Sequence, residues 1–223
     1  ERCFAELLLK MLIYSVAVLF LALQDSSGLK IYRSNVTECG NQGTMVYTVR
    51  RTFLEELNEI RASLAKGTVP SFPEAANMRF MAYDCNLEEE AIKLTATCDR
   101  FEDGTQSNRK RINVASFEWE GNGVIKVAKK AVAEWWDKKP HTWDKSQKIT
   151  ENDSMPFFLI AQAETDRVGC SVKICEYTHY NVACIFEKEA KVGHNLYEEG
   201  TACTDCAGHC YQKLCNATTS VQQ

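Results

Sequence analysis

Apolar residues recur at helical spacing in several stretches of the chain. The first stretch runs from Thr48 to Lys66 and carries four of them at offsets of four, three and four: Phe53, Leu57, Ile60 and Leu64. This is the spacing of one helical face, so the pattern predicts an amphipathic helix. Gly67 and Pro70 follow directly and are expected to end it.

Two further helices are predicted from similar patterns. Asn86 and Glu89 have the spacing of a capping box, and an apolar face follows them: Leu87, Ala91, Leu94 and Cys98. A third helix is expected from Val124 to Lys139, with Trp135 on its buried stripe, lysines opposite, and Pro140 at its end.

Two later segments have the pattern of strands. Residues 168–174 and 179–186 are rich in Val, Ile, Tyr and Phe, and the second alternates apolar positions: Tyr180, Val182, Cys184 and Phe186. Helices early and strands late predict an α+β fold built in layers. The polar stretch from Glu102 to Arg111 is expected to be an exposed loop.

The N-terminal region resembles a secretory leader. Met11 to Leu23 is apolar, Lys10 precedes it, and the small residues Ser26 and Gly28 suit cleavage before Leu29. A membrane anchor is the less favoured alternative, because a span needs about 20 apolar residues. We therefore expect a secreted, extracellular protein without a membrane span. Its predicted divisions are a leader with upstream residues (1–28), an N-terminal extension (29–47), a main domain (48–190) and a cysteine-rich tail (191–223).

The cysteine count agrees with an extracellular location. Removal of the leader takes away Cys3 and leaves ten cysteines, an even number that predicts five disulfides of open connectivity: Cys39, Cys85, Cys98, Cys170, Cys175, Cys184, Cys203, Cys206, Cys210 and Cys215. Three sequons offer possible N-glycosylation at Asn35, Asn152 and Asn216.

Few patterns in the chain point to chemistry. Cys203 and Cys206, with His209, Cys210 and Cys215, have spacings that could bind zinc, although the leader favours disulfides. The sequence contains no G-x-S-x-G, no H-E-x-x-H and no phosphate-binding glycine loop. Glu88 to Glu90 fall in the first turn of a predicted helix, where negative charge favours the helix dipole. Residues 29–223 carry 24 Lys and Arg against 27 Asp and Glu, a charge of −3 that gives no case for binding nucleic acid.

Several segments together resemble one known family. LNEIRASLAKG from Leu57 to Gly67 is similar to the HNxxR helix of the CAP family (SCP/TAPS proteins), with Asn58 and Arg61 kept and Leu57 in place of the His. The segment from Asn77 to Cys98 is similar to the nematode NMxxLxYDCxLExxA segment, and AVAEWWDK to a helix with paired aromatic residues. VGC and YNVAC resemble the family's final strands, and YEEGTACTDC the opening of its hinge-like tail. The chain is identified as a member of the nematode venom-allergen-like group of this family.

The resemblance implies a three-layer α-β-α sandwich with a cysteine-rich, hinge-like C-terminal tail. It also implies a central cleft in which two His and two Glu usually bind a divalent metal. In this chain the four positions are occupied by other residues: Glu102, Ile112, Lys138 and Pro156. These cannot rebuild a His and carboxylate site, so we expect neither a metal nor another cofactor.

The resemblance further implies a function at the protein surface. The chain is most similar to the hookworm group of neutrophil- and platelet-inhibitory type, which implies a non-enzymatic antagonist of host cell adhesion that binds an integrin on platelets or leukocytes. An extracellular carrier of lipid or sterol is the alternative, and an enzyme is the third. The sequence does not identify receptor-binding residues. The predicted loop from Glu102 to Arg111 is a candidate only because it is long, polar and exposed.

Overall fold

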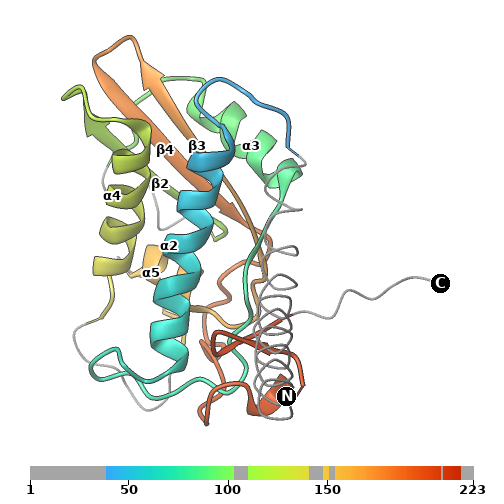
Figure 1. The fold of residues 1–223 in the computed structure, drawn as a ribbon. Coiled ribbons are helices and arrows are strands. Elements are labelled where there is room, and N and C mark those ends of the chain that lie inside the picture. The colour runs from blue at the N-terminus through green and yellow to red at the C-terminus, as the bar shows by residue number, and fades with distance from the viewer. Residues whose placement is uncertain (1–38, 103–109, 141–147, 151–153, 207, 217–223) are drawn as a thin grey trace, which may run out of the picture.

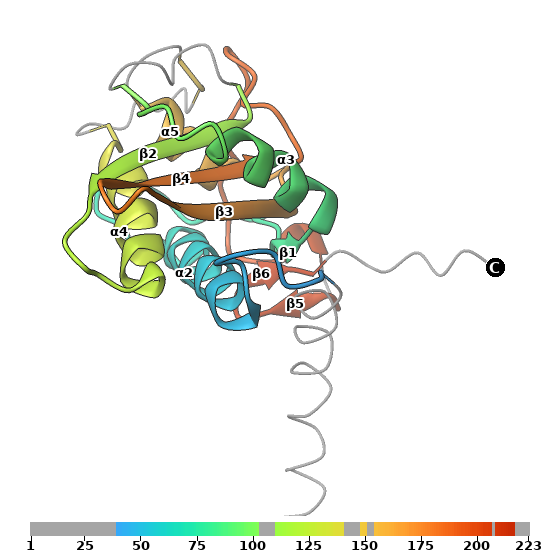
Figure 2. The same ribbon diagram turned by 90° about the horizontal axis from the view of Figure 1, so that it is seen from above.

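The computed structural model describes residues 39–102, 110–140, 148–150, 154–206 and 208–216, and a four-stranded sheet lies at its centre (Figures 1 and 2). Along the chain, the helices and strands of the main body are α2 (Tyr47–Ala65), β1 (Ala82–Tyr83), α3 (Cys85–Thr95), β2 (Ile112–Glu118), α4 (Val124–Asp137), α5 (Met155–Ala161), β3 (Arg167–Cys175) and β4 (His179–Phe186). The tail adds a single 3-10 turn, η1 (Thr204–Cys206), and a short hairpin of β5 (Cys210–Tyr211) and β6 (Leu214–Cys215).

The strands lie in the order β1-β3-β4-β2, and β4 pairs antiparallel with both β3 and β2. All eight residues of β4 are buried. The alternating residues of this strand therefore point to two faces of the sheet that are both covered, and neither face is open to solvent.

Helices cover both faces of the sheet. One face packs on α2, α4 and α5 around the main core, which includes Phe53, Trp135 and Phe157. The other packs on α3 around a smaller cluster: Leu87, Ala91, Val114, Ala183 and Ile185. The predicted α-β-α sandwich is confirmed.

The periodic segments are found close to their predicted bounds, but the start of α3 differs. The N-cap is Asp84, whose carboxylate accepts hydrogen bonds from the backbone N–H groups of Asn86 (2.9 Å) and Leu87 (3.1 Å). The predicted capping box of Asn86 and Glu89 is therefore wrong, because an acceptor two residues earlier already satisfies the first turn.

The glycine of the VGC segment, Gly169, is required for steric reasons. A Cβ atom on Gly169 would lie 2.1 Å from the backbone nitrogen of Glu88 and 2.4 Å from the carbonyl carbon of Leu87. Since such contacts are impossible, only glycine lets the first turn of α3 lie directly on β3.

The tail lies against the main body at one end of the molecule (Figure 1). The backbone N–H of Cys215 donates to Met78 O at 2.7 Å, and that of Phe80 donates to Cys215 O at 2.8 Å. Leu196 and Leu214 are buried in the main core. The tail is thus joined to the body by both hydrogen bonds and apolar contacts.

The ten cysteines form the five disulfides that their even number predicts. Three join parts of the main body, and two lie within the tail: Cys39–Cys85, Cys98–Cys175, Cys170–Cys184, Cys203–Cys210 and Cys206–Cys215. No helix among the described residues is long and apolar enough to span a membrane. The predicted leader, Asn35 and Asn152 lie outside the described residues.

Candidate functional site

The resemblance assigns four positions to the family's metal ligands, and two of them, Ile112 and Pro156, come near each other along the backbone while their side chains lie in different layers. Asn113 of β2, fully buried, donates from Nδ2 to Pro156 O at 3.0 Å. Ile112 therefore begins β2 next to the first turn of α5, where Pro156 is buried. Ile112 packs on the apolar cluster beneath α3, beside Leu94 and Phe101. The side chain of Ile112 therefore serves to pack against other apolar side chains.

The other two positions are exposed. Lys138 is the C-cap residue of α4, and Glu102 lies in the coil that follows α3. Of the four side chains, only that of Glu102 can donate to a metal at neutral pH, because Ile and Pro have no donor atom and Lys is a cation. The four residues therefore do not fit a divalent metal ion.

A buried ion pair links α2 to α3. Arg50 contacts Glu88 through both of its carboxylate oxygens, with Nε to Oε2 at 2.6 Å and Nη2 to Oε1 at 2.7 Å. Each side chain is only 1% exposed. Tyr83 donates its hydroxyl to Glu88 Oε2 at 2.6 Å and accepts from the Cys170 N–H at 3.2 Å.

The remaining donors of Arg50 bind the start of the described chain, since Nη1 donates to Cys39 O at 3.0 Å and Nη2 to Gly40 O at 2.6 Å. Burial, together with the neighbouring Glu88 carboxylate, raises the pKa of Tyr83 well above its ordinary value. Burial lowers the pKa of Arg50 and the contact with Glu88 raises it, with a net increase. Every charged group here has a partner, so the cluster is a structural lock rather than a reactive centre.

The two retained residues of the HNxxR segment are also structural. Asn58 exchanges two hydrogen bonds with the backbone of Met81. Arg61 is fully buried, and its guanidinium donates to five backbone carbonyls: those of Arg79, Ile160, Gln162, Ala163 and Thr165. Burial lowers the pKa of Arg61 to about 9, which still leaves the group protonated at neutral pH. This arginine joins α2 to the segment after α5.

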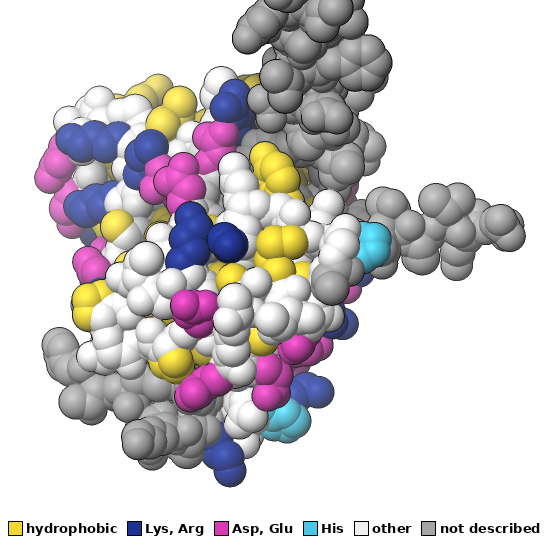
Figure 3. Space-filling view, turned by 60° about the horizontal axis from the view of Figure 1, so that its bottom comes forward, with side chains coloured by type: hydrophobic (Ala, Val, Ile, Leu, Met, Phe, Trp, Pro, Cys, Tyr) yellow, Lys and Arg dark blue, Asp and Glu magenta, His cyan; other side chains and the backbone are white. Residues whose placement is uncertain are grey.

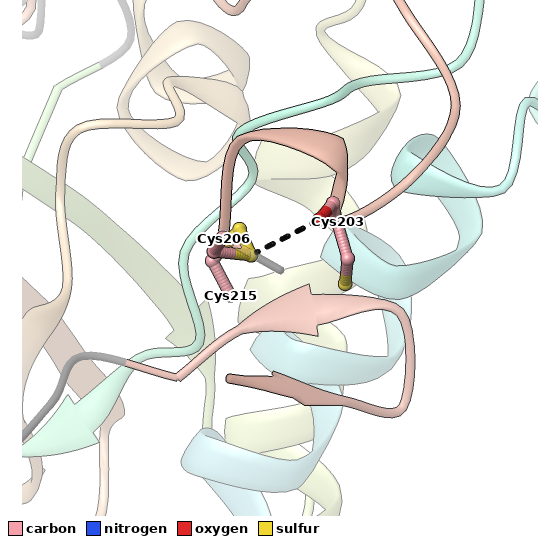
Figure 4. A group of neighbouring side chains, drawn as sticks. All are labelled: Cys203, Cys206 and Cys215. Atoms are coloured by element: carbon pink, nitrogen blue, oxygen red, sulfur yellow. Dashed lines mark hydrogen bonds between the residues drawn. A yellow bond between two sulfur atoms is a disulfide. The ribbon is translucent and has the colours of Figure 1, made fainter. Parts of the chain in front are cut away.

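The cysteines of the tail come together as disulfides. The sulfur atoms of Cys203, Cys206 and Cys215 lie within 4.8 Å of one another, the one such grouping of potential metal ligands among the described residues. Figure 4 shows Cys206 beside Cys215, with its sulfur also directed at the carbonyl of Cys203, 3.7 Å away. Each sulfur is already bonded to another sulfur, so none is a thiolate ligand.

The surface around the tail is polar and of mixed charge. A groove of about 600 Å³ lies between the body and the tail, with Arg79 and Glu164 on one side and Asp205 and His209 on the other. A second groove, of about 540 Å³, shares Glu164 and continues along the segment after β4. Figure 3, which looks onto this end, shows cationic, anionic and apolar side chains interspersed.

The histidines do not form a catalytic arrangement among the described residues. His179 is buried; its Nε2 lies 3.1 Å from Cys98 O, and its Nδ1 lies 2.8 Å from Thr178 Oγ1. His194 and His209 are exposed. His141 lies outside the described residues. Asn216, the third predicted glycosylation site, is half-buried at the end of the described tail.

The fold and the disulfides define a class: an α-β-α sandwich stabilised by five cystines, whose tail packs on the body. A model for "CAP: Cysteine-rich secretory protein family" matches residues 54–186. The chain belongs to the CAP family.

Similar proteins come from hookworms. The chain is 29% identical over 189 residues to the Ancylostoma secreted protein of Ancylostoma caninum, covering 76% of this chain but only 43% of that protein. It is 28% identical over 167 residues to hookworm platelet inhibitor 1 of the same species, covering 72% of this chain and 74% of the relative.

Solved structures agree on the fold. The crystal structure of NaASP2 with Zn2+ has a TM-score of 0.70 at 27% identity and covers 79% of this chain and 99% of that one. The structure of hookworm platelet inhibitor has a TM-score of 0.65 at 24% identity and covers 81% and 96%. At that identity the second likeness concerns the fold alone.

Proposed function

We propose that this chain is a secreted, non-enzymatic effector that antagonises host cell adhesion by binding a surface receptor, an integrin on platelets or leukocytes. One observation carries the proposal: the CAP fold and its five disulfides are present, yet Ile112, Lys138 and Pro156 occupy three of the four positions at which the resemblance places metal ligands. The similarity to hookworm platelet inhibitor 1 supports it. Secretion of residues 29–223, with glycans at Asn35, Asn152 and Asn216, is part of the same proposal.

An antagonist of this kind acts by covering its receptor, so it needs a rigid surface rather than a reactive group. The buried Arg50–Glu88 pair and the Cys39–Cys85 disulfide both fix the start of α3. A surface held in this way loses little conformational entropy on binding, which favours affinity.

The test is an assay of adhesion and aggregation with washed platelets and, in parallel, neutrophils. The refolded chain from Leu29 onward, with its disulfides verified, is compared with a reduced and alkylated sample. We expect a dose-dependent block by the folded form alone. A folded sample that leaves both cell types unaffected would sink the proposal.

Carriage of lipid or sterol is the alternative. The two grooves beside the tail are lined mainly by polar and charged residues, which do not suit a lipid chain. Titration with a fluorescent sterol separates the two functions, because the antagonist needs no lipid. Saturable uptake by a sample that is inactive on cells would favour the carrier.

A further inference from the structure

The turn between β3 and β4 is built from residues that fit it poorly. Glu176 and Tyr177 both have positive φ angles, 50° and 57°, although neither is glycine. They are the two central residues of the β-turn from Cys175 to Thr178, where positive φ angles favour Asn and Gly because a Cβ atom is crowded there. The chain thus accepts backbone strain at this position. Strain that persists at a surface turn is a reason to look for a role there.

Tyr177 is also unusually exposed. At 73% it is the most exposed large apolar side chain among the described residues. Its ring makes an edge contact with Trp119, with centroids 5.3 Å apart, and Trp119 in turn packs on Tyr180 at 4.9 Å. Most of the phenol ring therefore gains nothing from the fold, although aromatic side chains are the usual anchors of protein interfaces.

The turn is rigid despite its exposure. The Cys98–Cys175 disulfide fixes the residue before it, and the Thr178 N–H donates to Cys175 O at 2.9 Å. The Trp119 N–H donates to Thr178 O at 3.0 Å, which joins the turn to the end of β2. An aromatic ring held this firmly loses little freedom when a partner covers it. We call residues 176–178 together with Trp119 the hairpin tip.

Three glutamates lie at or beside the hairpin tip, and one of them has a cationic partner. Glu118 precedes Trp119 and pairs with Arg100 at 2.7 and 2.9 Å. Glu120 and Glu176 are exposed, and within the described part of the chain Glu120 accepts a hydrogen bond from the neutral amide of Asn122, at 2.9 Å.

Two lysines of α4 share a pocket with Glu118 and Glu120. Lys126 and Lys130 line the helix side of this pocket, which has a volume of about 200 Å³ and lies next to the tip. Lys126 donates to Asn122 Oδ1 at 2.9 Å, and Lys130 lies over the Phe117 ring at 4.6 Å. Neither lysine forms an ion pair with Glu120, so among the described residues Glu120 and Glu176 are acidic side chains without an ion-pair partner.

We propose that the hairpin tip is the contact surface for a protein partner, with Tyr177 as its aromatic anchor and Glu120 and Glu176 facing basic side chains of that partner. The inference rests on the proposed function, since the partner is then the adhesion receptor. The tip lies at the opposite end of the molecule from the tail (Figure 1), so the two surfaces can be varied independently.

The first test measures binding of fluorescently labelled full-length mature chain to washed platelets and neutrophils. Tyr177→Ala is compared with Tyr211→Ala, a matched aromatic on the tail that is 37% exposed. We expect Tyr177→Ala to weaken binding at least tenfold and Tyr211→Ala to change it less than twofold. Equal binding by wild type and Tyr177→Ala would overturn the assignment of the hairpin tip and leave the proposed function standing. A wild-type chain that binds neither cell type would overturn both the assignment of the hairpin tip and the proposed function.

A second pair of variants separates binding from folding. Glu176→Asn with Tyr177→Gly relieves the strained turn, so its melting temperature should equal or exceed that of wild type while cell binding is lost. Glu120→Lys with Glu176→Lys should weaken binding at least fivefold at physiological salt and keep the wild-type melting temperature. Stable variants that retain full binding would contradict the assignment of the hairpin tip.

Discussion

Around α3 the chain is held by buried contacts that depend on one another. The tail, in contrast, is closed on itself by two short disulfide loops and joins the body through backbone hydrogen bonds and two buried leucines. In the first region an ion pair, a tyrosine hydroxyl and a glycine contact share the same few residues. In the second, two disulfides close loops with sequence separations of 7 and 9. The difference suggests that one change near α3 disturbs many contacts, while a change in the tail stays local.

The largest effect is expected from Gly169→Ala. The new methyl group would collide with backbone atoms of α3, which cannot move without opening the contact between helix and sheet. We predict a loss of more than about 4 kcal/mol in the free energy of unfolding, measured by chemical denaturation. Gly123→Ala is the control, because an added Cβ there meets nothing within 4 Å. Equal stability of the two variants would contradict the close approach of α3 to β3.

The next largest effect is expected from Glu88→Gln. It leaves the buried Arg50 guanidinium without its counter-charge, which costs about 3–5 kcal/mol in comparable pairs. Glu90→Gln removes the same charge two residues later from an exposed pair with Arg111, where the cost is below about 1 kcal/mol. The free energy of unfolding of both variants is measured by urea denaturation. Similar midpoints would show that the Arg50–Glu88 pair contributes no more to stability than the exposed pair.

The ion pair also shows where sequence patterns stop being informative. The apolar spacing within 48–66, 124–139 and 179–186 predicts three elements, because their periodicity is local. Glu88 is interpreted from the sequence as a helix-dipole residue, since its partner Arg50 lies 38 positions earlier and no local pattern links them.

Two elements of the body escape sequence-based prediction for a different reason. Helix α5 is buried at all seven positions, and β2 is buried at four of its seven. Neither offers the contrast between apolar and polar faces from which a period is recognised. The hairpin tip escapes it as well, because an exposed tyrosine in a strained turn becomes visible only from backbone angles.

An intermediate effect is expected from removing a tail disulfide. For Cys206→Ser with Cys215→Ser, a loop of about ten residues predicts a loss of about 2–3 kcal/mol. Amide hydrogen exchange should accelerate at Phe80, whose N–H donates to Cys215 O, and stay slow in β4. Faster exchange throughout β4 would show that the tail and body unfold together, and would erase the contrast between the two regions.

The smallest effect is expected from Tyr83→Phe, which removes the hydroxyl that donates to Glu88 and accepts from the Cys170 N–H, at a cost of about 1–2 kcal/mol at pH 7. The folded-state pKa of Tyr83 is raised, so above its ordinary value of 10.0 the unfolded chain releases a proton that the folded chain retains. Stability from this group is therefore present below pH 10 and lost as the pH rises. Wild type should lose stability more steeply than the variant between pH 9 and 11, and parallel profiles would argue against a buried phenol.

The disulfide connectivity has a consequence for biosynthesis. Cys39 can meet Cys85 once 46 further residues have been made, but Cys98 must wait for Cys175, 77 positions later. During that interval Cys98 lacks its native partner and can pair with the nearby Cys85, either before Cys85 has reacted with Cys39 or by exchange with that disulfide, because short loops close more readily than long ones. Oxidative maturation therefore competes with an early mispairing, and we expect disulfide isomerase to raise the yield of native protein more than added oxidant does.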